Sequence, residues 1–377
     1  MIRVLVVDDS VVVRQIVSDA LRHDARIEIV GLAQNGKIAL EKIPTANPDV
    51  VTLDLEMPEM DGLETLTEIR KRFPKLPVVV FSTLTERGAT ATLEALSRGA
   101  SDYVCKPSGQ RNVQSTMEKI KDELLPKIHA LAGRKLASSA HSGRPAHSTP
   151  SSASVTHSHP SPAQQSTASA PTAPVSLVVI AVSTGGPAAL AEVVPRLPPA
   201  LRQPVLIVQH MPPVFTRVLA QRLAGSSPLK VREATHQERI QGGNVLIAPG
   251  DFHMRIAGST RESWVTLDQQ SAENGCRPAA DPLFTSAASI YGAGVLAVIM
   301  TGLGRDGTKG AALVRKASGQ VWAQDEASAT VWGMPGSVVE AGLAQRIIPL
   351  QQIARAIAVA CHADAGQPGP RPVKKSS

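Results

Sequence analysis

Aromatic and cysteine residues are scarce in this chain. Phe, Trp and Tyr make up only 3% of its 377 residues, so its cores must be built mainly from aliphatic side chains. The three cysteines, Cys105, Cys276 and Cys361, are odd in number and widely spaced, which fits neither a disulfide framework nor a zinc site. This usage is typical of a reducing compartment, and we expect a cytoplasmic protein.

Long apolar runs and a signal-peptide pattern are absent as well. No stretch approaches the ~18 apolar residues of a membrane-spanning helix, and a strand pattern begins within residues 1–7, so we expect no membrane insertion. The net charge of +7 raises the question of nucleic-acid binding. No basic helix with interleaved aromatic residues accompanies it, and part of the excess lies in residues 371–375. We therefore expect no nucleic-acid partner.

Composition divides the chain into domains. Residues 133–174 contain 11 Ser, 8 Ala, 6 Pro and 4 His but no Asp or Glu. They have too few large apolar side chains for burial to offset the entropy lost on ordering. The four histidines are irregularly spaced and lack acidic or thiol neighbours, which argues against a metal site there. We predict one domain over residues 1–125, a disordered linker over 126–174, a second domain over 175–362 and a disordered tail over 363–377.

The first domain alternates five short apolar strands with five helices. This alternation predicts a doubly wound parallel sheet, whose ligand site lies at the carboxyl ends of the strands. Carboxylates that converge there repel one another unless a hard cation such as Mg²⁺ neutralises them, while a lysine and a hydroxyl suit a phosphoryl oxygen. Helix capping alone would not explain Asp54, which follows the apolar run 50–53. The polar residues at the strand ends are Asp8, Asp9, Asp54, Thr83 and Lys106.

The second domain repeats the alternation and is predicted to be a mostly parallel α/β sheet, with an antiparallel hairpin near 253–267 as an addition. Its first strand, 177–182, ends at Ser183 and a Gly-Gly-Pro turn into a helix. Strands near 204–209 and 294–300 lead to His210 and Asp306. Because carboxyl ends of parallel strands meet at one edge, Ser183, His210 and Asp306 should converge as nucleophile, base and orienting carboxylate.

Each of these three residues also has a simpler explanation. Ser183 could be a helix N-cap, His210 a strand-end residue bonded to backbone, and Asp306 part of an ordinary Arg-Asp-Gly turn. The order Ser, His, Asp along the chain and the absence of a Gly-x-Ser-x-Gly sequence differ from common hydrolase examples. Geometry rather than order defines a catalytic triad, so neither difference excludes one.

The first domain resembles the receiver domains of response regulators. The resemblance rests on the segments 7–10, 53–62, 82–83 and 103–107, which read VDDS, LDLEMPEMDG, ST and YVCKP. It implies a phosphoacceptor at Asp54 and a cis peptide bond at Lys106–Pro107. It also implies a Mg²⁺ site and a set of switch residues. The Mg²⁺ ligands would be Asp8, Asp9, Asp54 and the Glu56 carbonyl, and the switch residues Thr83, Tyr103 and Lys106.

The second domain resembles the catalytic domain of the chemotaxis protein-glutamate methylesterases, the CheB family. The matching segments are AVSTGG (181–186), QHMPP (209–213), IAPG (247–250), TGLGRDG (301–307), AQDEAS (323–328) and GMP (333–335). The resemblance implies hydrolysis of glutamate methyl esters on chemoreceptor helices and deamidation of receptor glutamines. Ser183, His210 and Asp306 would form the triad, with no cofactor for the esterase reaction. Thr184, Leu303 and Arg277 are the oxyanion or substrate candidates.

The two resemblances together imply an esterase controlled by phosphorylation for chemotaxis adaptation. The phosphodonor would be a chemotaxis sensor histidine kinase, the substrate a methyl-accepting chemoreceptor, and we expect a monomer. Two other classes remain open. A receiver-gated DNA-binding regulator would need a basic helix-turn-helix after the linker, where alternating buried strands stand instead. A non-catalytic adaptor that docks on receptors would not need the three residues of the triad.

Overall fold

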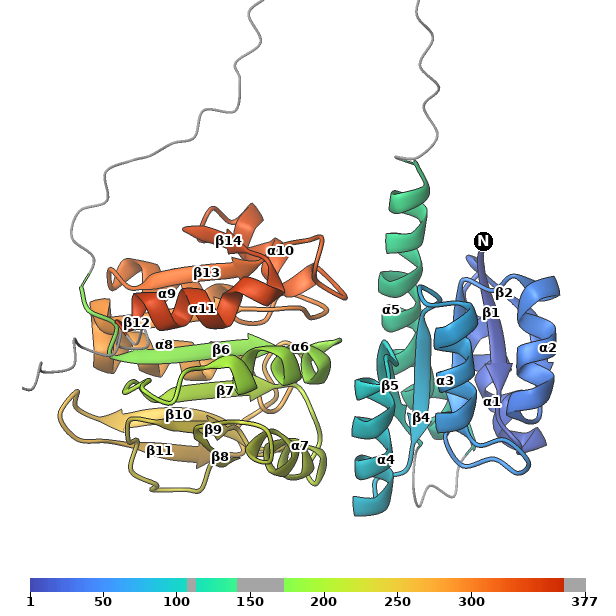
Figure 1. The fold of residues 1–377 in the computed structure, drawn as a ribbon, viewed down its shortest axis with the longest axis horizontal. Coiled ribbons are helices and arrows are strands. Elements are labelled where there is room, and N and C mark those ends of the chain that lie inside the picture. Colours follow the sequence, from blue (N-terminus) through green and yellow to red (C-terminus); the bar gives the residue numbers. More distant parts are fainter. Residues whose placement is uncertain (107–112, 141–172, 363–377) are drawn as a thin grey trace, which may run out of the picture.

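The computed structural model describes residues 1–106, 113–140 and 173–362. They form two α/β domains (Figure 1). The expected disordered tail and the peptide bond at Lys106–Pro107 lie outside the described residues, as does the linker from 141 to 172. No helix within the described ranges is both long and apolar enough to cross a membrane.

The first domain is a five-stranded parallel sheet in the order β2-β1-β3-β4-β5. Strands β1, β3 and β4 are almost entirely buried because helices cover both faces of the sheet (Figure 1). The predicted doubly wound architecture is therefore confirmed. Its elements are β1 (Ile2–Val7), α1 (Val11–Arg22), β2 (Ile27–Ala33), α2 (Gly36–Ala46), β3 (Val50–Asp54), α3 (Gly62–Arg72), β4 (Val78–Ser82), α4 (Glu86–Ser97), β5 (Asp102–Cys105) and α5 (Val113–Ala140).

Helix α5 corrects the predicted start of the linker. Residues 126–140 were expected to belong to the linker, but the helix continues to Ala140. The physical reason is burial: Ile128, Leu131 and Ala132 share one face of α5 and pack in the same apolar cluster as Val17 and Leu21 of α1. A helix extended by packing of this kind is not visible in composition alone.

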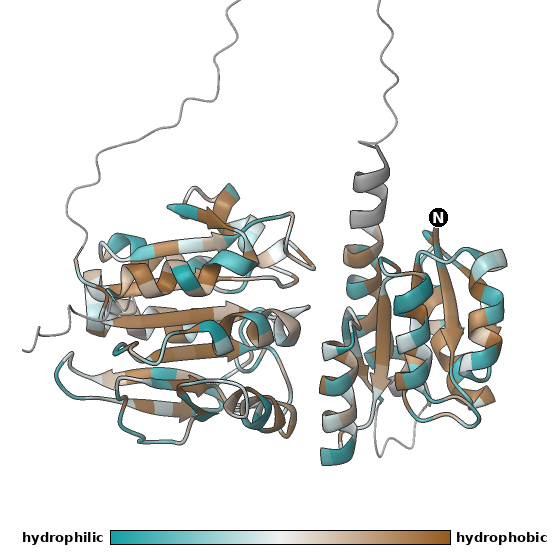
Figure 2. Ribbon diagram, viewed as in Figure 1, coloured by the Kyte–Doolittle hydropathy of each residue, from teal (hydrophilic) through white to brown (hydrophobic). Residues whose placement is uncertain are grey.

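The second domain is a seven-stranded parallel sheet in the order β14-β13-β12-β6-β7-β9-β8. Figure 2 shows its central strands as apolar throughout, whereas the helices carry polar residues. Its elements are β6 (Leu177–Val182), α6 (Gly186–Val193), β7 (Val205–Gln209), α7 (Phe215–Ala224), β8 (Lys230–Glu233), β9 (Asn244–Ile247), β10 (His253–Gly258), β11 (Ser263–Asp268), α8 (Ala280–Tyr291), β12 (Val295–Ile299), α9 (Thr308–Lys316), β13 (Gln320–Gln324), α10 (Gly333–Glu340), β14 (Arg346–Ile348) and α11 (Leu350–Ala360).

Two details differ from the sequence prediction. The hairpin of β10 and β11 is antiparallel as expected, but it forms its own two-stranded sheet instead of extending the large one. It packs on α8, where the backbone N–H of Ile256 donates to Ser286 Oγ at 3.0 Å. Strand β14 was not predicted, because three residues at a sheet edge are too short to show a periodic pattern.

The two domains contact each other at the carboxyl-end edge of the larger sheet. In Figure 1 strands β6 and β7 point toward the first domain. Helix α4 packs against α6 and α7, the helices that follow these two strands. Arg222 of α7 bridges the interface: its guanidinium lies 3.1 Å from Glu94 Oε2 and donates to Ser97 Oγ at 2.7 Å. The first domain therefore lies over the edge where Ser183 and His210 were predicted.

Candidate active site

Strand register places Ser183 beside His210. In the parallel pairing of β6 with β7, Val182 is opposite Gln209, so the next residues of the two strands lie side by side. The backbone N–H of His210 donates to the carbonyl of Val182 at 3.2 Å. On the other flank, the N–H of Ser183 donates to the carbonyl of Thr301 at 2.9 Å, just past β12. The structure thus brings the three strand ends to one edge of the sheet.

Asp306 is hydrogen-bonded to His210. Its Oδ2 lies 2.7 Å from His210 Nε2, and the side chains are only 2% and 9% exposed. The same oxygen accepts the backbone N–H of Ala280 at 2.6 Å, and Oδ1 accepts that of Asp281 at 3.2 Å. Both donors stand at the start of α8, where unpaired N–H groups and the helix dipole favour a negative charge. Asp306 is therefore held in a fixed orientation against the imidazole.

The buried His210–Asp306 pair favours the charged form of both partners. Burial opposes protonation of His210, but its hydrogen bond to Asp306 and the negative charge of that carboxylate raise the pKa of the imidazole, and the Cys276 sulfur adds to the effect. Burial likewise opposes ionisation of Asp306, but the hydrogen bond and charge of His210 and the two α8 N–H donors lower the pKa of that carboxyl. The pair can therefore stabilise an imidazolium, which is what a general base becomes when it accepts a proton.

Ser183 Oγ makes no hydrogen bond to any described residue, so its arm of the triad is open in this structure. With Asp306 on Nε2, the ring nitrogen left to accept a proton from Ser183 is Nδ1. Gly302 explains how the 301–304 loop comes so close to the serine. A Cβ on that residue would lie 2.8 Å from Ser183 Cβ, which only glycine avoids.

Two backbone N–H groups flank Ser183 without an acceptor among the described residues. They belong to Thr184, which begins the turn into α6, and to Leu303 in the loop after β12. That turn requires a left-handed residue at Gly185, with φ 76°, and any side chain there would clash with Thr330. Neither N–H group is committed to an acceptor in the described part of the chain, so both are candidates to bind an oxygen that carries negative charge.

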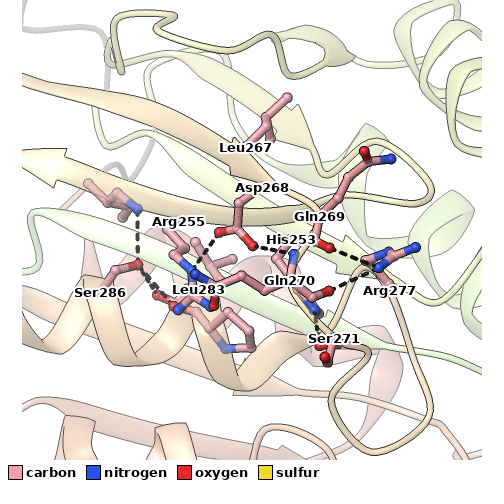
Figure 3. A network of polar contacts seen from close by, with 12 residues as sticks. His253, Arg255, Leu267, Asp268, Gln269, Gln270, Ser271, Arg277, Leu283 and Ser286 are labelled. Atoms are coloured by element: carbon pink, nitrogen blue, oxygen red, sulfur yellow. Dashed lines mark hydrogen bonds and ion pairs between the residues drawn. The ribbon is translucent and has the colours of Figure 1, made fainter.

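Arg277, predicted as a substrate candidate, contacts protein groups. Its guanidinium binds Asp251 Oδ1 at 2.6 and 3.0 Å. It also donates to the carbonyl oxygens of Gln269 and Gln270 at 3.1 and 3.0 Å (Figure 3). These bonds hold the loop between β11 and α8.

A second polar site lies in the first domain. Carboxylate oxygens of Asp8, Asp9 and Asp54 all lie within 4.8 Å of one another. Lys106 Nζ is 2.6 Å from Asp54 Oδ2 and 3.2 Å from Asp8 Oδ2, and that buried Asp8 oxygen accepts no hydrogen bond. A buried carboxylate oxygen whose contact with Lys106 is an ion pair without hydrogen-bond geometry, beside two further carboxylates, fits the ligand set of Mg²⁺.

Electrostatics single out Asp54 within this site. Burial raises its pKa to about 6, with Asp8 adding to the effect and Lys106 opposing it. The backbone N–H of Glu56 lies 3.4 Å from Asp54 Oδ1, which places that residue next to the carboxylates.

The predicted switch residues lie on the neighbouring strands. Thr83 follows β4, with its hydroxyl 3.1 Å from that of Thr85. Tyr103 of β5 is buried, and its ring stacks on Phe215 of the second domain.

Three further residues around the triad were not predicted from the sequence. Gln209 Nε2 donates to the backbone carbonyls of Ser183 and His210 at 3.1 and 3.3 Å. Asn274 Nδ2 donates to Asp306 Oδ1 at 3.0 Å, and Cys276 helps to raise the pKa of His210. Gln209 and Cys276 left no signal as functional residues. Asn274-Gly275 is a typical turn dipeptide, but nothing in the sequence shows what the turn approaches.

Comparisons with known proteins agree with this division into two domains. A family model described as CheB methylesterase matches residues 178–357, and one described as response regulator receiver domain matches residues 4–118. Three similar curated proteins are named protein-glutamate methylesterase/protein-glutamine glutaminase, and the name of the one from Caulobacter vibrioides carries the number 2. The relative from Nocardioides sp. is 48% identical over 353 residues, 93% of this chain and 93% of its own length. The relative from Trichodesmium erythraeum is 44% identical, and the match covers 94% of this chain and 97% of the relative's length. The relative from Caulobacter vibrioides is 45% identical, and the match covers 94% of this chain and 98% of the relative's length.

Proposed function

This chain belongs to the family of protein-glutamate methylesterases/protein-glutamine glutaminases, and we propose that it hydrolyses glutamate methyl esters on chemoreceptor helices and deamidates receptor glutamines to glutamate. The observation that carries the proposal is the hydrogen bond between His210 and buried Asp306, directly beside Ser183. Nucleophile, base and orienting carboxylate then stand together at one sheet edge, as acyl transfer requires.

In the proposed reaction Ser183 Oγ forms a bond to the ester carbonyl carbon while His210 takes its proton. The bond to the methoxy oxygen then breaks, and methanol leaves with the proton from His210. Water, deprotonated in turn by His210, attacks the acyl-enzyme, which releases the glutamate carboxylate and restores the serine. With glutamine the leaving group is ammonia. Asp306 orients the ring and stabilises the imidazolium formed in each step.

The free N–H groups of Leu303 and Thr184 are the proposed oxyanion donors. Each flanks Ser183 and has no acceptor among the described residues, so neither must break a bond to receive the carbonyl oxygen as its charge develops. Arg277 remains a candidate for substrate positioning, because its side chain is 28% exposed although Asp251 binds it.

The proposed control element is the receiver domain, with Asp54 as phosphoacceptor. Mg²⁺, held by Asp8, Asp9, Asp54 and the Glu56 carbonyl, would neutralise phosphoryl oxygens during transfer. Lys106 lies 2.6 Å from Asp54 and Thr83 directly follows the neighbouring strand β4, so both can bind the added phosphoryl group. Because α4 packs on the helices that follow Ser183 and His210, the unphosphorylated receiver would exclude a receptor helix from the triad.

The remaining assignments follow from this proposal. The phosphodonor would be a chemotaxis sensor histidine kinase, and the biological outcome adaptation of receptor signalling. The three cysteines are unpaired and none lies near another in the sequence, which fits the reducing cytoplasm where receptor signalling helices lie. We propose a monomer as the working form.

Methanol release from purified methylated receptor tests the proposal, with ammonia release from a glutamine-bearing receptor as its counterpart. The full chain supplied with a phosphodonor and Mg²⁺ should produce both, and Ser183→Ala should abolish both, because one nucleophile serves the two acyl transfers. Ser176→Ala, at the opposite end of β6, is the matched control and should keep the wild-type rate. A non-catalytic adaptor would bind receptor without releasing methanol. Substantial release by Ser183→Ala would rule out the assigned nucleophile.

A further inference from the structure

A tight turn lies directly against the His210–Asp306 pair. Glu273 and Cys276 exchange backbone hydrogen bonds of 3.1 and 2.9 Å across it. The two central residues, Asn274 and Gly275, have φ of 54° and 76°. This left-handed pair defines a turn for which Asn-Gly is the preferred dipeptide. The turn therefore has a fixed shape set by its own sequence.

The side-chain amide of Asn274 bridges two buried carboxylates. Its Nδ2 donates to Asp306 Oδ1 at 3.0 Å and to Asp281 Oδ2 at 3.1 Å, and these aspartates are 2% and 3% exposed. An amide nitrogen carries two hydrogens, so it satisfies one oxygen of each carboxylate. The second oxygen of Asp281 accepts the backbone N–H of Gly310 at 2.8 Å.

The four donors to Asp306 divide between its oxygens. Oδ2 receives the short bonds from His210 and the Ala280 N–H, at 2.7 and 2.6 Å. Oδ1 receives Asn274 and the Asp281 N–H, at 3.0 and 3.2 Å. Among the described residues Asn274 is thus the only side chain that bonds Oδ1. Without it, rotation of the carboxylate away from His210 would meet less resistance.

We propose that Asn274 is a positioning residue, which fixes the Asp306 carboxylate in the orientation that holds His210 for proton transfer. This inference rests on the proposed triad and concerns how that triad is kept aligned. The charged and titratable groups involved are few. His210 faces Asp306 and the Cys276 thiol, Asp306 faces Asp281 as well, and Asp281 also feels Glu273.

Electrostatics give the proposal a direction. Burial, together with the charge of Asp306, raises the pKa of Asp281, so the two carboxylates repel across the bridging amide. Removing Asn274 leaves the charge on Asp306 less neutralised by hydrogen bonding. The Ala280 N–H still holds Oδ2 beside His210 in such a variant, so the carboxylate is less precisely oriented but its charge stays next to the ring. That charge then favours the imidazolium form of His210, so the acid limb of the pH–rate profile should move to higher pH.

The loop that carries the turn is held by other contacts. Arg277 binds Asp251. It also donates to the carbonyls of Gln269 and Gln270 (Figure 3). His253 Nε2 donates to the carbonyl of Ser271 at 3.1 Å. Deleting the Asn274 side chain therefore leaves the loop attached on both sides of the turn at residues 273–276.

The experiment compares three variants of the full chain in the methanol-release assay across pH. Asn274→Gly deletes the amide and keeps a left-handed turn. A hydrogen bond to a charged group contributes about 1.5–3 kcal/mol, so kcat should fall roughly 10- to 100-fold while KM changes less than about twofold. The acid limb should move to higher pH. Asn274→Asp keeps the side-chain size, adds a charge and should move the limb further.

Ser318→Gly is the matched control. Ser318 is also left-handed, with φ 64°, and lies just before β13 at the sheet edge opposite the triad, so its variant should behave as wild type. A wild-type kcat and acid limb in Asn274→Gly would overturn the proposal. So would a lower rate with an unshifted limb, since that pattern indicates only a structural role. If the wild-type chain supplied with a phosphodonor and Mg²⁺ releases no methanol, the proposed function itself fails, which is a different result.

Discussion

The ring of Tyr103 in the receiver domain stacks on the ring of Phe215 in the catalytic domain, with centroids 5.1 Å and planes 9° apart. Tyr103 occupies a predicted switch position on β5, and Phe215 begins α7, five residues after His210. Both side chains are buried. A rearrangement of Tyr103 on phosphorylation would therefore act directly on the element that follows the proposed base.

The ion pair between Arg222 and Glu94 lies at the same interface, and replacing Arg222 should weaken the contact between the two domains. Arg222 bonds Glu94 and Ser97 of α4, and Arg222→Glu would place two carboxylates opposite each other. Exposed pairs contribute about 0.2–1 kcal/mol, so basal methanol release by the unphosphorylated chain should rise roughly 2- to 5-fold. The same substitution in a fragment of residues 173–377 is the control and should change nothing. An equal rise in both proteins would contradict an effect through the interface.

Asp54 should make receiver stability depend on pH in a specific direction. Its pKa is about 6 in the folded state against 3.8 without the fold, so the folded receiver binds more protons between those values. The free energy of unfolding therefore falls as pH rises through that window. Asp54→Asn mimics the neutral form and should stabilise the receiver by about 1–3 kcal/mol at pH ~7.5 without Mg²⁺, less at pH ~5, and not at all below pH ~4.

Hydrogen-exchange protection of the β1, β3 and β4 amides measures this effect in the receiver alone. Asp122→Asn, on an exposed position of α5, is the control and should leave the pH dependence unchanged. If Asp54→Asn stabilised the receiver more strongly as the pH fell, the result would show that the fold does not oppose ionisation of the Asp54 carboxyl.

The convergence of Ser183, His210 and Asp306 could be predicted because one topological rule places all carboxyl ends of parallel strands at the same edge. The buried strands were equally clear, since runs such as 177–182 are apolar throughout. These features depend on patterns within a few residues.

Features that depend on tertiary packing could not be read from the chain. Residues 126–140 were assigned to the linker, and the burial of Ile128 and Leu131 shows why the helix continues past residue 125. Asn274 stands 32 positions before Asp306, and its contact depends on the path of the loop between β11 and α8. The Tyr103–Phe215 stack joins two domains whose relative placement no local pattern encodes.

Control of the triad by the receiver is tested most directly by the initial rate of methanol release from methylated receptor. The measurement compares residues 173–377 with the unphosphorylated full chain. An interface that excludes substrate with about 1–3 kcal/mol of coupling predicts a fragment 5- to 150-fold faster. A phosphodonor with Mg²⁺ should bring the full chain toward the fragment's rate but leave Asp54→Asn slow. A fragment no faster than the unphosphorylated full chain would contradict inhibition by the receiver.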